Sequence, residues 1–96
     1  MRRLRLAQEA SDALDHQLSY LEQQGAYQAA SSLHARVRNF LVDFLSVYPA
    51  TGRYLPRYKV WECAIPRTRL VVWYTFDKTE IWIVTFWHAS QDRRQN

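Results

Sequence analysis

The chain has 96 residues, 48% of them hydrophobic, with four Trp, six Tyr and four Phe but only two Gly and three Pro. A chain of this length fills one core, so residues 1–96 are expected to form a single domain, and the composition excludes a disordered or fibrous protein. The net charge is +4, and residues 49–96 carry the whole excess, with eight Lys or Arg against four acids. This asymmetry indicates an acidic partner, either nucleic acid or an acidic protein segment.

The single cysteine, Cys63, excludes an intramolecular disulfide, and no apolar run approaches the roughly 20 residues that span a bilayer. The basic start lacks the apolar stretch of a signal peptide, so we expect a cytoplasmic protein without a membrane partner. Cys63 has no Cys or His at zinc-ligand spacing, and neither His16 nor His34 clusters with His88 in the sequence. No metal and no cofactor are therefore expected.

The first half of the chain predicts a strand followed by two helices. Two leucines alternate with arginines over residues 2–6, which is the period of a strand with one apolar face. From Ala7 the apolar spacing becomes helical, and Gly25 fits the end of that helix because glycine adopts positive φ easily. A second apolar face extends over residues 29–48, before Pro49 prevents its continuation. The two helices should form an antiparallel hairpin.

The second half predicts three strands, rich in β-branched and aromatic residues, over 58–65, 69–76 and 80–88. The connections between them are short enough to be hairpin turns, so the three strands should be antiparallel neighbours. Strict alternation in the last strand would place Ile81, Ile83, Thr85 and Trp87 on one face and Trp82, Val84 and Phe86 on the other. The predicted class is α+β: an N-terminal strand, an antiparallel helical hairpin and then a mainly antiparallel β-sheet.

Certain residues add a family resemblance to this order of elements. They are, along the chain, Leu4-Arg5-Leu6 leading into Glu9-Ala10 and Asp12-Ala13-Leu14, then Tyr48-Pro49-Ala50-Thr51-Gly52-Arg53, then Val71-Val72-Trp73-Tyr74 with Asp77, and finally Ile83-Val84 leading to His88 and Asp92. In this order and spacing they resemble the ParE/RelE superfamily of toxins from bacterial toxin-antitoxin pairs. Each residue alone is explained by folding; the set, over about 80 positions, favours the resemblance.

The resemblance implies one of two activities. RelE-like members are ribosome-dependent endoribonucleases that cut messenger RNA, and ParE-like members inhibit DNA gyrase. For a ribonuclease, the side chains able to supply a base, an acid and cations are Lys59, Glu62, Arg67, Arg69 and His88. However, Val71 stands where RelE-like chains usually carry arginine, and the ending from His88 to Asp92 is ParE-like. We therefore favour a non-enzymatic gyrase inhibitor over a ribonuclease, with a nucleic-acid-binding module as a third alternative.

The resemblance also implies a cognate antitoxin, whose flexible segment wraps the toxin in a hetero-oligomeric complex. Apolar sheet residues expected to face away from the helices are the predicted antitoxin contacts: Trp73, Trp82, Val84 and Phe86. Basic and terminal residues are the predicted target contacts: Arg53, Arg69, His88, Asp92, Arg93 and Arg94. For His88 the alternative is a structural role, in which it caps the last strand by a hydrogen bond to the backbone or to Asp92.

Overall fold

The computed structural model describes residues 1–91, so the predicted contacts Asp92, Arg93 and Arg94 lie outside the described residues. In chain order the elements are β1 (Arg3–Leu6), α1 (Gln8–Gln23), α2 (Tyr27–Asn39), a π-helical turn η1 (Phe40–Leu45), a 3-10 turn η2 (Pro49–Thr51), β2 (Arg53–Leu55), β3 (Val60–Ala64), β4 (Leu70–Phe76) and β5 (Glu80–His88). Within this part of the chain, no helix is long and apolar enough to cross a membrane.

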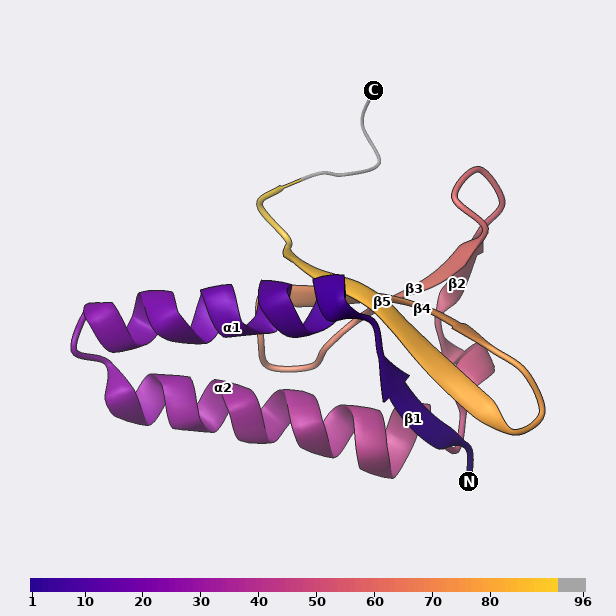
Figure 1. The fold of residues 1–96 in the computed structure, drawn as a ribbon, viewed down its shortest axis with the longest axis horizontal. Coiled ribbons are helices and arrows are strands. Elements are labelled where there is room, and N and C mark those ends of the chain that lie inside the picture. The colour runs from indigo at the N-terminus through magenta and orange to yellow at the C-terminus, as the bar shows by residue number, and fades with distance from the viewer. Residues whose placement is uncertain (92–96) are drawn as a thin grey trace.

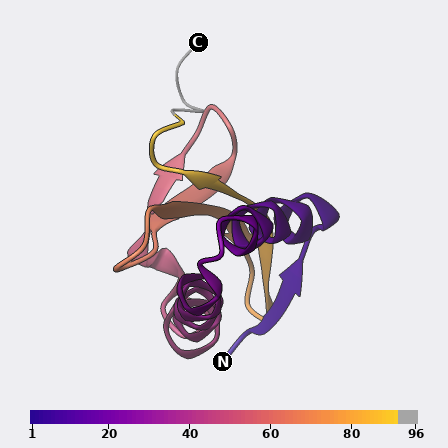
Figure 2. The same cartoon turned by 90° about the vertical axis from the view of Figure 1, so that its left-hand side faces the viewer.

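The strands form one five-stranded sheet in the order β1-β5-β4-β3-β2. β3, β4 and β5 are antiparallel neighbours, as predicted, and β1 adds to β5 in parallel, so the sheet is mixed but mostly antiparallel. The α1–α2 hairpin lies beside the sheet, and Figures 1 and 2 show the two helices side by side. This confirms the predicted α+β class; β2, which pairs with β3, was not predicted.

The turn between the helices is closed by Gly25, which has a φ of 76°. Its backbone N–H donates to the carbonyl oxygen of Glu22, and the N–H of Ala26 donates to that of Leu21, each at 2.9 Å. These two bonds satisfy carbonyl groups that the helix end would leave unpaired, and they require a left-handed residue at Gly25. The predicted end of the first helix is therefore confirmed.

The second helix changes its geometry before it ends. At η1 the backbone N–H of Ser46 donates to the carbonyl oxygen of Leu41, five residues back, at 3.0 Å. This wider turn rotates the following residues about the helix axis. Leu41 and Leu45 are buried, whereas Phe44 and Tyr48 are exposed. The expectation that the apolar face continues to Tyr48 is therefore wrong.

A β-bulge in β5 changes which side chains face the helices. Trp73 pairs with Thr85 and the next residue, Tyr74, pairs with Ile83, so Val84 is an extra residue. Beyond it the alternation is reversed, and Phe86, only 3% exposed, packs in the core beneath the helices. The expectation that Phe86 faces away from the helices with Trp82 is wrong, because a one-residue insertion exchanges the two faces of a strand.

Two groups of buried side chains cover the two faces of the sheet. The main core, between the hairpin and the sheet, consists of Ala10, Val37, Leu41, Leu45, Ile65, Leu70, Val72, Tyr74, Ile81, Ile83 and Phe86. The smaller cluster, on the face away from the helices, consists of Val60, Val71, Trp73 and Trp87. Both faces of β4 are thus covered, which explains why its sequence is continuously apolar.

Candidate functional site

Two of the predicted target contacts, Arg69 and His88, lie together at one end of the sheet. β4 begins at Leu70, which pairs with His88, and the N–H of Ala89 donates to the carbonyl oxygen of Arg69 at 2.7 Å. The two side chains share a cleft of about 270 Å³ between the hairpin and the sheet. Its lining is Gln17, Tyr20 and Leu21 of α1, Leu33 of α2, and Arg69, Leu70 and His88. A cation and an imidazole therefore border a cleft with an apolar floor.

The hydrogen bonds of His88 fix which nitrogen carries the proton. The backbone N–H of Ser90 donates to Nδ1 at 3.1 Å, and the Ser90 hydroxyl lies 2.7 Å from the same atom. Because a backbone N–H can only donate, Nδ1 must accept, and the neutral ring carries its proton on Nε2. His88 thus bonds to the backbone just after β5, as its structural alternative expected, and keeps an Nε2–H donor.

The remaining described target contact, Arg53, lies elsewhere. It begins β2, at the far edge of the sheet from β1, and its Nη2 is 3.4 Å from Oε1 of Glu62. β5, which carries His88, is separated from β2 by two intervening strands. Neighbouring strands are about 4.8 Å apart, so Arg53 does not share the cleft with His88.

The five side chains considered for ribonuclease chemistry do not form one constellation. Glu62 pairs with Trp73, which belongs to the cluster away from the helices, whereas His88 pairs with Leu70, which belongs to the main core. Directly paired residues share a face, so the carboxylate of Glu62 and the imidazole of His88 lie on opposite faces of the sheet. General acid and base groups must reach one substrate, and these two cannot.

The other ribonuclease candidates are dispersed as well. Lys59 lies in the turn before β3 and Arg67 in the turn after it, and both have positive φ. The five residues of β3 lie between them. The carbonyl oxygen of Arg67 accepts a hydrogen bond from Arg36 at 3.1 Å. Glu62 accepts a hydrogen bond from the indole N–H of Trp73 at 2.8 Å. Of the five, only Arg69 and His88 are brought together.

The predicted antitoxin contacts are also separated by the fold. Trp73 is 7% exposed and Phe86 is 3% exposed, so both are largely covered within the chain. Val84 is half-buried at the bulge. Trp82 is 39% exposed, and the guanidinium of Arg5 lies 4.7 Å from its ring centroid. Of the four, only Trp82 keeps the exposed apolar surface that was expected of them.

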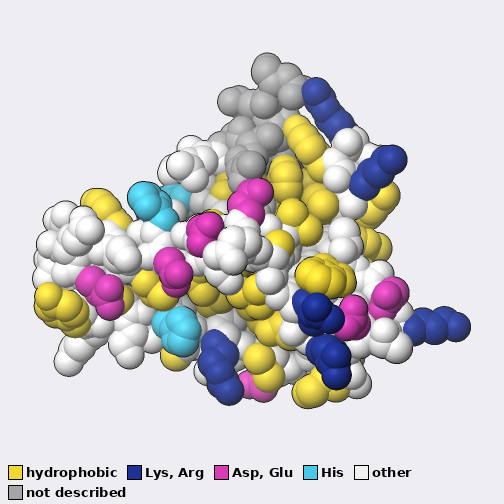
Figure 3. All heavy atoms as spheres, viewed as in Figure 1, with side chains coloured by type: hydrophobic (Ala, Val, Ile, Leu, Met, Phe, Trp, Pro, Cys, Tyr) yellow, Lys and Arg dark blue, Asp and Glu magenta, His cyan; other side chains and the backbone are white. Residues whose placement is uncertain are grey.

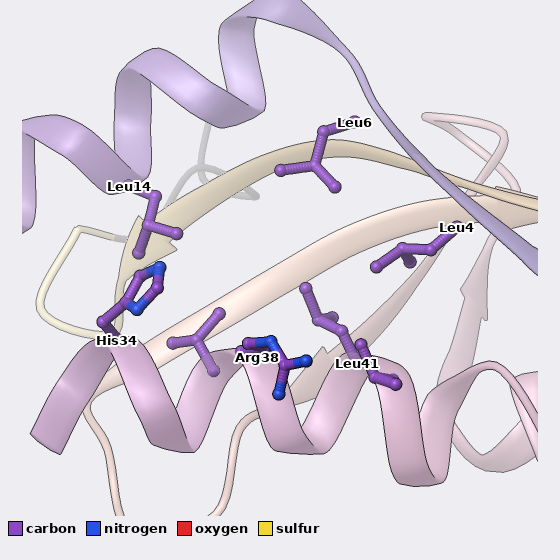
Figure 4. A pocket seen from close by; sticks show the side chains of 8 residues that line it. Leu4, Leu6, Leu14, His34, Arg38 and Leu41 are labelled. Carbon is purple, nitrogen blue, oxygen red and sulfur yellow. The ribbon is translucent and has the colours of Figure 1, made fainter.

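An apolar groove at the β1 edge was missed in the sequence. It has a volume of about 150 Å³ and lies between β1, α1 and α2, as Figure 4 shows. Its lining is Leu4, Leu6, Leu14, His34, Val37, Arg38, Leu41 and Val42. The alternating leucines of residues 2–6 were the available signal, but they were interpreted only as the apolar face of a strand.

Two hydrogen bonds of the buried Tyr74 hydroxyl were not predicted from the sequence either. Its hydroxyl donates to the carbonyl oxygen of Pro49 at 2.6 Å and accepts from the N–H of Gly52 at 3.2 Å. Burial, with a smaller contribution from Cys63, raises the pKa of Tyr74 to about 12 against the lowering effect of the Gly52 hydrogen bond. These two hydrogen bonds fix the position of the loop that leads to Arg53. Among residues 1–91, no three His, Cys, Asp or Glu side chains are grouped as metal ligands.

The fold defines the class of this protein as a small α+β domain with a helical hairpin packed on one face of a five-stranded mixed sheet. Residues 4–93 match the family described as the ParE toxin of the type II toxin-antitoxin system parDE, and the chain belongs to that family. A solved structure, described as the chromosomal ParDE TA system from P. aeruginosa, is similar with a TM-score of 0.76 and 17% identity, covering 92% of this chain and 96% of that one. No curated protein matches the sequence. The family match confirms the resemblance drawn from the motifs.

Proposed function

We propose that this ParE toxin inhibits DNA gyrase in the cytoplasm and is neutralised by a cognate antitoxin. The family match over residues 4–93 carries the proposal. The dispersion of the acid, base and cationic candidates supports it, because Glu62 and His88 lie on opposite faces of the sheet. Val71, at the position of the arginine usual in RelE-like ribonucleases, is a buried aliphatic residue that offers no charge to a phosphate.

The cleft bordered by Arg69 and His88 is the proposed contact with the target. Arg69 supplies a permanent positive charge, and Nε2 of His88 supplies a neutral donor, while the leucines of the cleft supply apolar surface. Such a set binds acceptor groups on a protein surface without transferring protons. Inhibition then follows from occupation of the gyrase surface and requires no bond cleavage by the toxin.

The test is a gyrase supercoiling assay with purified protein. Arg69→Ala and His88→Ala are each expected to raise the inhibitory concentration by about tenfold, the effect of losing one hydrogen bond that involves a charged or strongly polar group. Lys78→Ala is the matched control, because Lys78 is exposed in the turn before β5, at the opposite end of that strand from His88. Protein that leaves supercoiling unchanged but cuts messenger RNA on ribosomes would reverse the assignment.

Neutralisation is tested separately by growth. Induction of the toxin alone should arrest growth, and co-induction of the small open reading frame beside its gene should restore it. Continued arrest, with the two proteins failing to co-purify, would contradict the antitoxin part of the proposal and leave the gyrase part standing.

A further inference from the structure

Two hollows continue the cleft of Arg69 and His88 along the second helix. The cleft itself is bordered by Leu33 of α2 and by Arg69 of the turn between β3 and β4. The next hollow, of about 270 Å³, is lined by Arg36, Asn39, Phe40, Asp43, Pro66 and Arg67. The last hollow, of about 360 Å³, is lined by Phe40, Phe44, Thr51, Cys63, Ala64 and Pro66.

The cleft and the two hollows form one groove between two antiparallel walls. From one hollow to the next, the residue numbers rise along the helical wall and fall along the opposite wall, and the last two hollows share Phe40 and Pro66. Nη1 of Arg36 donates to the carbonyl oxygen of Arg67 at 3.1 Å, which holds the walls together. The rings of Phe40 and Phe44 stack with their centroids 5.4 Å apart, so the helical wall continues through η1. The α2–turn groove thus has one wall of Leu33, Arg36, Phe40 and Phe44 and another of Ala64, Pro66, Arg67 and Arg69.

The two ends of the α2–turn groove differ in chemistry. Near the cleft the exposed side chains are cationic: Arg36, Arg67 and Arg69. Asp43 borders the middle hollow and offsets part of this charge. The far end is apolar, and Phe44, although large and hydrophobic, is 38% exposed there. The groove therefore suits a segment with acidic groups at one end and a large apolar side chain at the other.

The other helix of the hairpin has the opposite charge. α1 carries acids and no Lys or Arg, whereas α2 carries Arg36 and Arg38 and no acids. The acids of α1 are all exposed: Glu9, Asp12, Asp15 and Glu22. Figure 3 shows acidic side chains gathered along α1. An acidic segment is therefore repelled by α1 and attracted to the wall that α2 forms.

Arg67 presents a charge that the fold does not use. Its φ is 59°, a value that glycine adopts freely and that other residues seldom adopt. Its contact with Arg36 involves only its carbonyl oxygen. Within residues 1–91 the guanidinium of Arg67 has no hydrogen-bond or ion-pair partner, and the side chain is exposed. Glycine would therefore serve the turn as well, and the charge of Arg67 is available to a partner.

We propose that the target contact extends from the cleft along the α2–turn groove, which takes an extended segment of gyrase with Asp or Glu at one end and an aromatic residue at the other. The acid lies beside Arg36 and Arg67, and the aromatic ring enters the hollow beside Phe44. A cavity of about 150 Å³ holds a benzene-sized group, so this hollow has room for the ring. The identity of the partner rests on the proposed function, whereas the chemistry of the groove does not.

The spacing of the two anchors follows from the helical wall. Arg36 and Phe44 lie about 12 Å apart along the helix axis, at a rise of about 1.5 Å per residue. An extended chain covers this distance in about four residues. The matching probe is a blocked peptide with two aspartates, three serines and a tryptophan, made in this order and in the reverse order. One control replaces the aspartates with lysine, and the other replaces the tryptophan with alanine.

The first experiment measures peptide binding and does not depend on gyrase. In one of its two orders, the probe is expected to bind at least about tenfold more tightly than either control. Cys63 borders the apolar hollow and is the single cysteine of the chain, so its alkylation rate reports whether the hollow is filled. At a probe concentration of about ten times Kd, alkylation should slow about tenfold. A control that binds equally, no binding in either order, or an unchanged alkylation rate would overturn the proposed groove.

The second experiment compares two variants in the gyrase supercoiling assay. Arg67→Gly removes the charge and relieves the positive φ, and Lys59→Gly makes the same change in the turn at the other end of β3. Neither variant should lower the urea midpoint, so a loss of inhibition reports binding. Arg67→Gly should raise the inhibitory concentration about tenfold, and Lys59→Gly should leave it unchanged. If the wild type inhibits and the two variants behave alike, the groove is overturned and the proposed function stands. If the wild type does not inhibit while the probe binds, gyrase is overturned as the partner and the groove stands.

Discussion

Tyr74 donates its phenolic hydrogen to the carbonyl oxygen of Pro49 at 2.6 Å and so ties β4 to the loop that follows the second helix. Gly52 donates its N–H to the same phenolic oxygen at 3.2 Å. The two bonds occupy the hydroxyl as donor and as acceptor. Residues that the sequence separates by more than 20 positions are thus joined at one buried point, and the loop enters β2 at Arg53 in a fixed position.

Replacing Gly52 with alanine should destabilise the fold by about 1–3 kcal/mol, the usual cost of overpacking. A Cβ atom at this position would lie 2.5 Å from the carbonyl oxygen of Glu62 and 2.5 Å from the hydroxyl of Tyr74, closer than real Cβ atoms approach other groups. The φ of Gly52 is −75°, so the effect would be steric rather than conformational. Urea unfolding gives the free energy difference.

Gly25→Ala is the contrasting variant for that measurement. A Cβ at Gly25 would meet nothing within 4 Å, but the φ of 76° disfavours any side chain. Gly25→Ala should therefore lower the free energy of unfolding by about 1 kcal/mol, because of the backbone conformation alone. If Gly52→Ala leaves the unfolding free energy unchanged, the close approach at Glu62 and Tyr74 is refuted.

Tyr74→Phe should lower the free energy of unfolding by about 1–3 kcal/mol, because it leaves the buried carbonyl of Pro49 and the N–H of Gly52 without their partner. The effect should also depend on pH. Burial raises the pKa of Tyr74 to about 12, above its ordinary value of about 10, so the neutral phenol is favoured in the folded state. Its stabilising contribution is complete below about pH 10 and is lost as the pH rises towards 12.

Urea unfolding of the wild type and Tyr74→Phe between about pH 8 and pH 11 tests this dependence. The wild type should lose its advantage as the pH rises. A constant difference across the range would show that Tyr74 ionises alike in the folded and unfolded chains, and would contradict its buried, doubly bonded environment.

The order of the elements was predictable because local chemistry determines it. Apolar alternation, helical spacing, Gly25 and the short turns of the second half act over few residues, and they placed the hairpin and β3 to β5 correctly. The bulge at Val84 was not predictable, because it depends on how β5 pairs with β4. The π-helical turn and β2 likewise depend on tertiary contacts with the sheet.

The site was predictable only in part, for the same reason. Arg69 and His88 meet because Arg69 immediately precedes β4 and His88 ends β5, and these two strand ends lie together opposite the hairpin turn. The predicted antiparallel pairing of the two strands already implied this. The grouping of Trp82 with Phe86 failed because it assumed unbroken alternation across Val84. To predict the groove beside Leu4 and Leu6, one must know that β1 is an edge strand, and only the order of the strands in the sheet shows this.

Phe86→Ala and Trp82→Ala distinguish the bulged from the unbroken arrangement of β5. Phe86 is in the main core, so Phe86→Ala should lower the free energy of unfolding by about 3–5 kcal/mol. Trp82 is 39% exposed and contacts Arg5, so its truncation should cost no more than about 1 kcal/mol. Urea unfolding measures both. Unbroken alternation places both side chains on the face away from the helices and so predicts comparable losses, and a loss at Phe86 no larger than that at Trp82 would disprove the bulge.

Asp77 should stabilise the turn between β4 and β5 only while it is ionised. Its Oδ1 accepts the N–H groups of Thr79 and Glu80, each at 2.8 Å, and the Thr79 hydroxyl at 3.2 Å. The hydrogen bond from the backbone of Thr79, followed by that from Glu80, lowers the pKa of Asp77, although burial opposes this. A lowered folded pKa means that the contribution is present above the ordinary value of about 4 and is lost as the pH falls through the folded value.

Urea unfolding at about pH 6 and about pH 3 should therefore show the wild type more stable than Asp77→Ala at the higher pH and closer to it at the lower pH. Asp77→Asn is the control, since its amide oxygen can accept the same two N–H bonds but does not titrate. Asp77→Asn should retain its margin over Asp77→Ala at both pH values. If the wild-type margin over Asp77→Ala does not shrink on acidification, Asp77 accepts the hydrogen bonds of the turn whether or not it is charged.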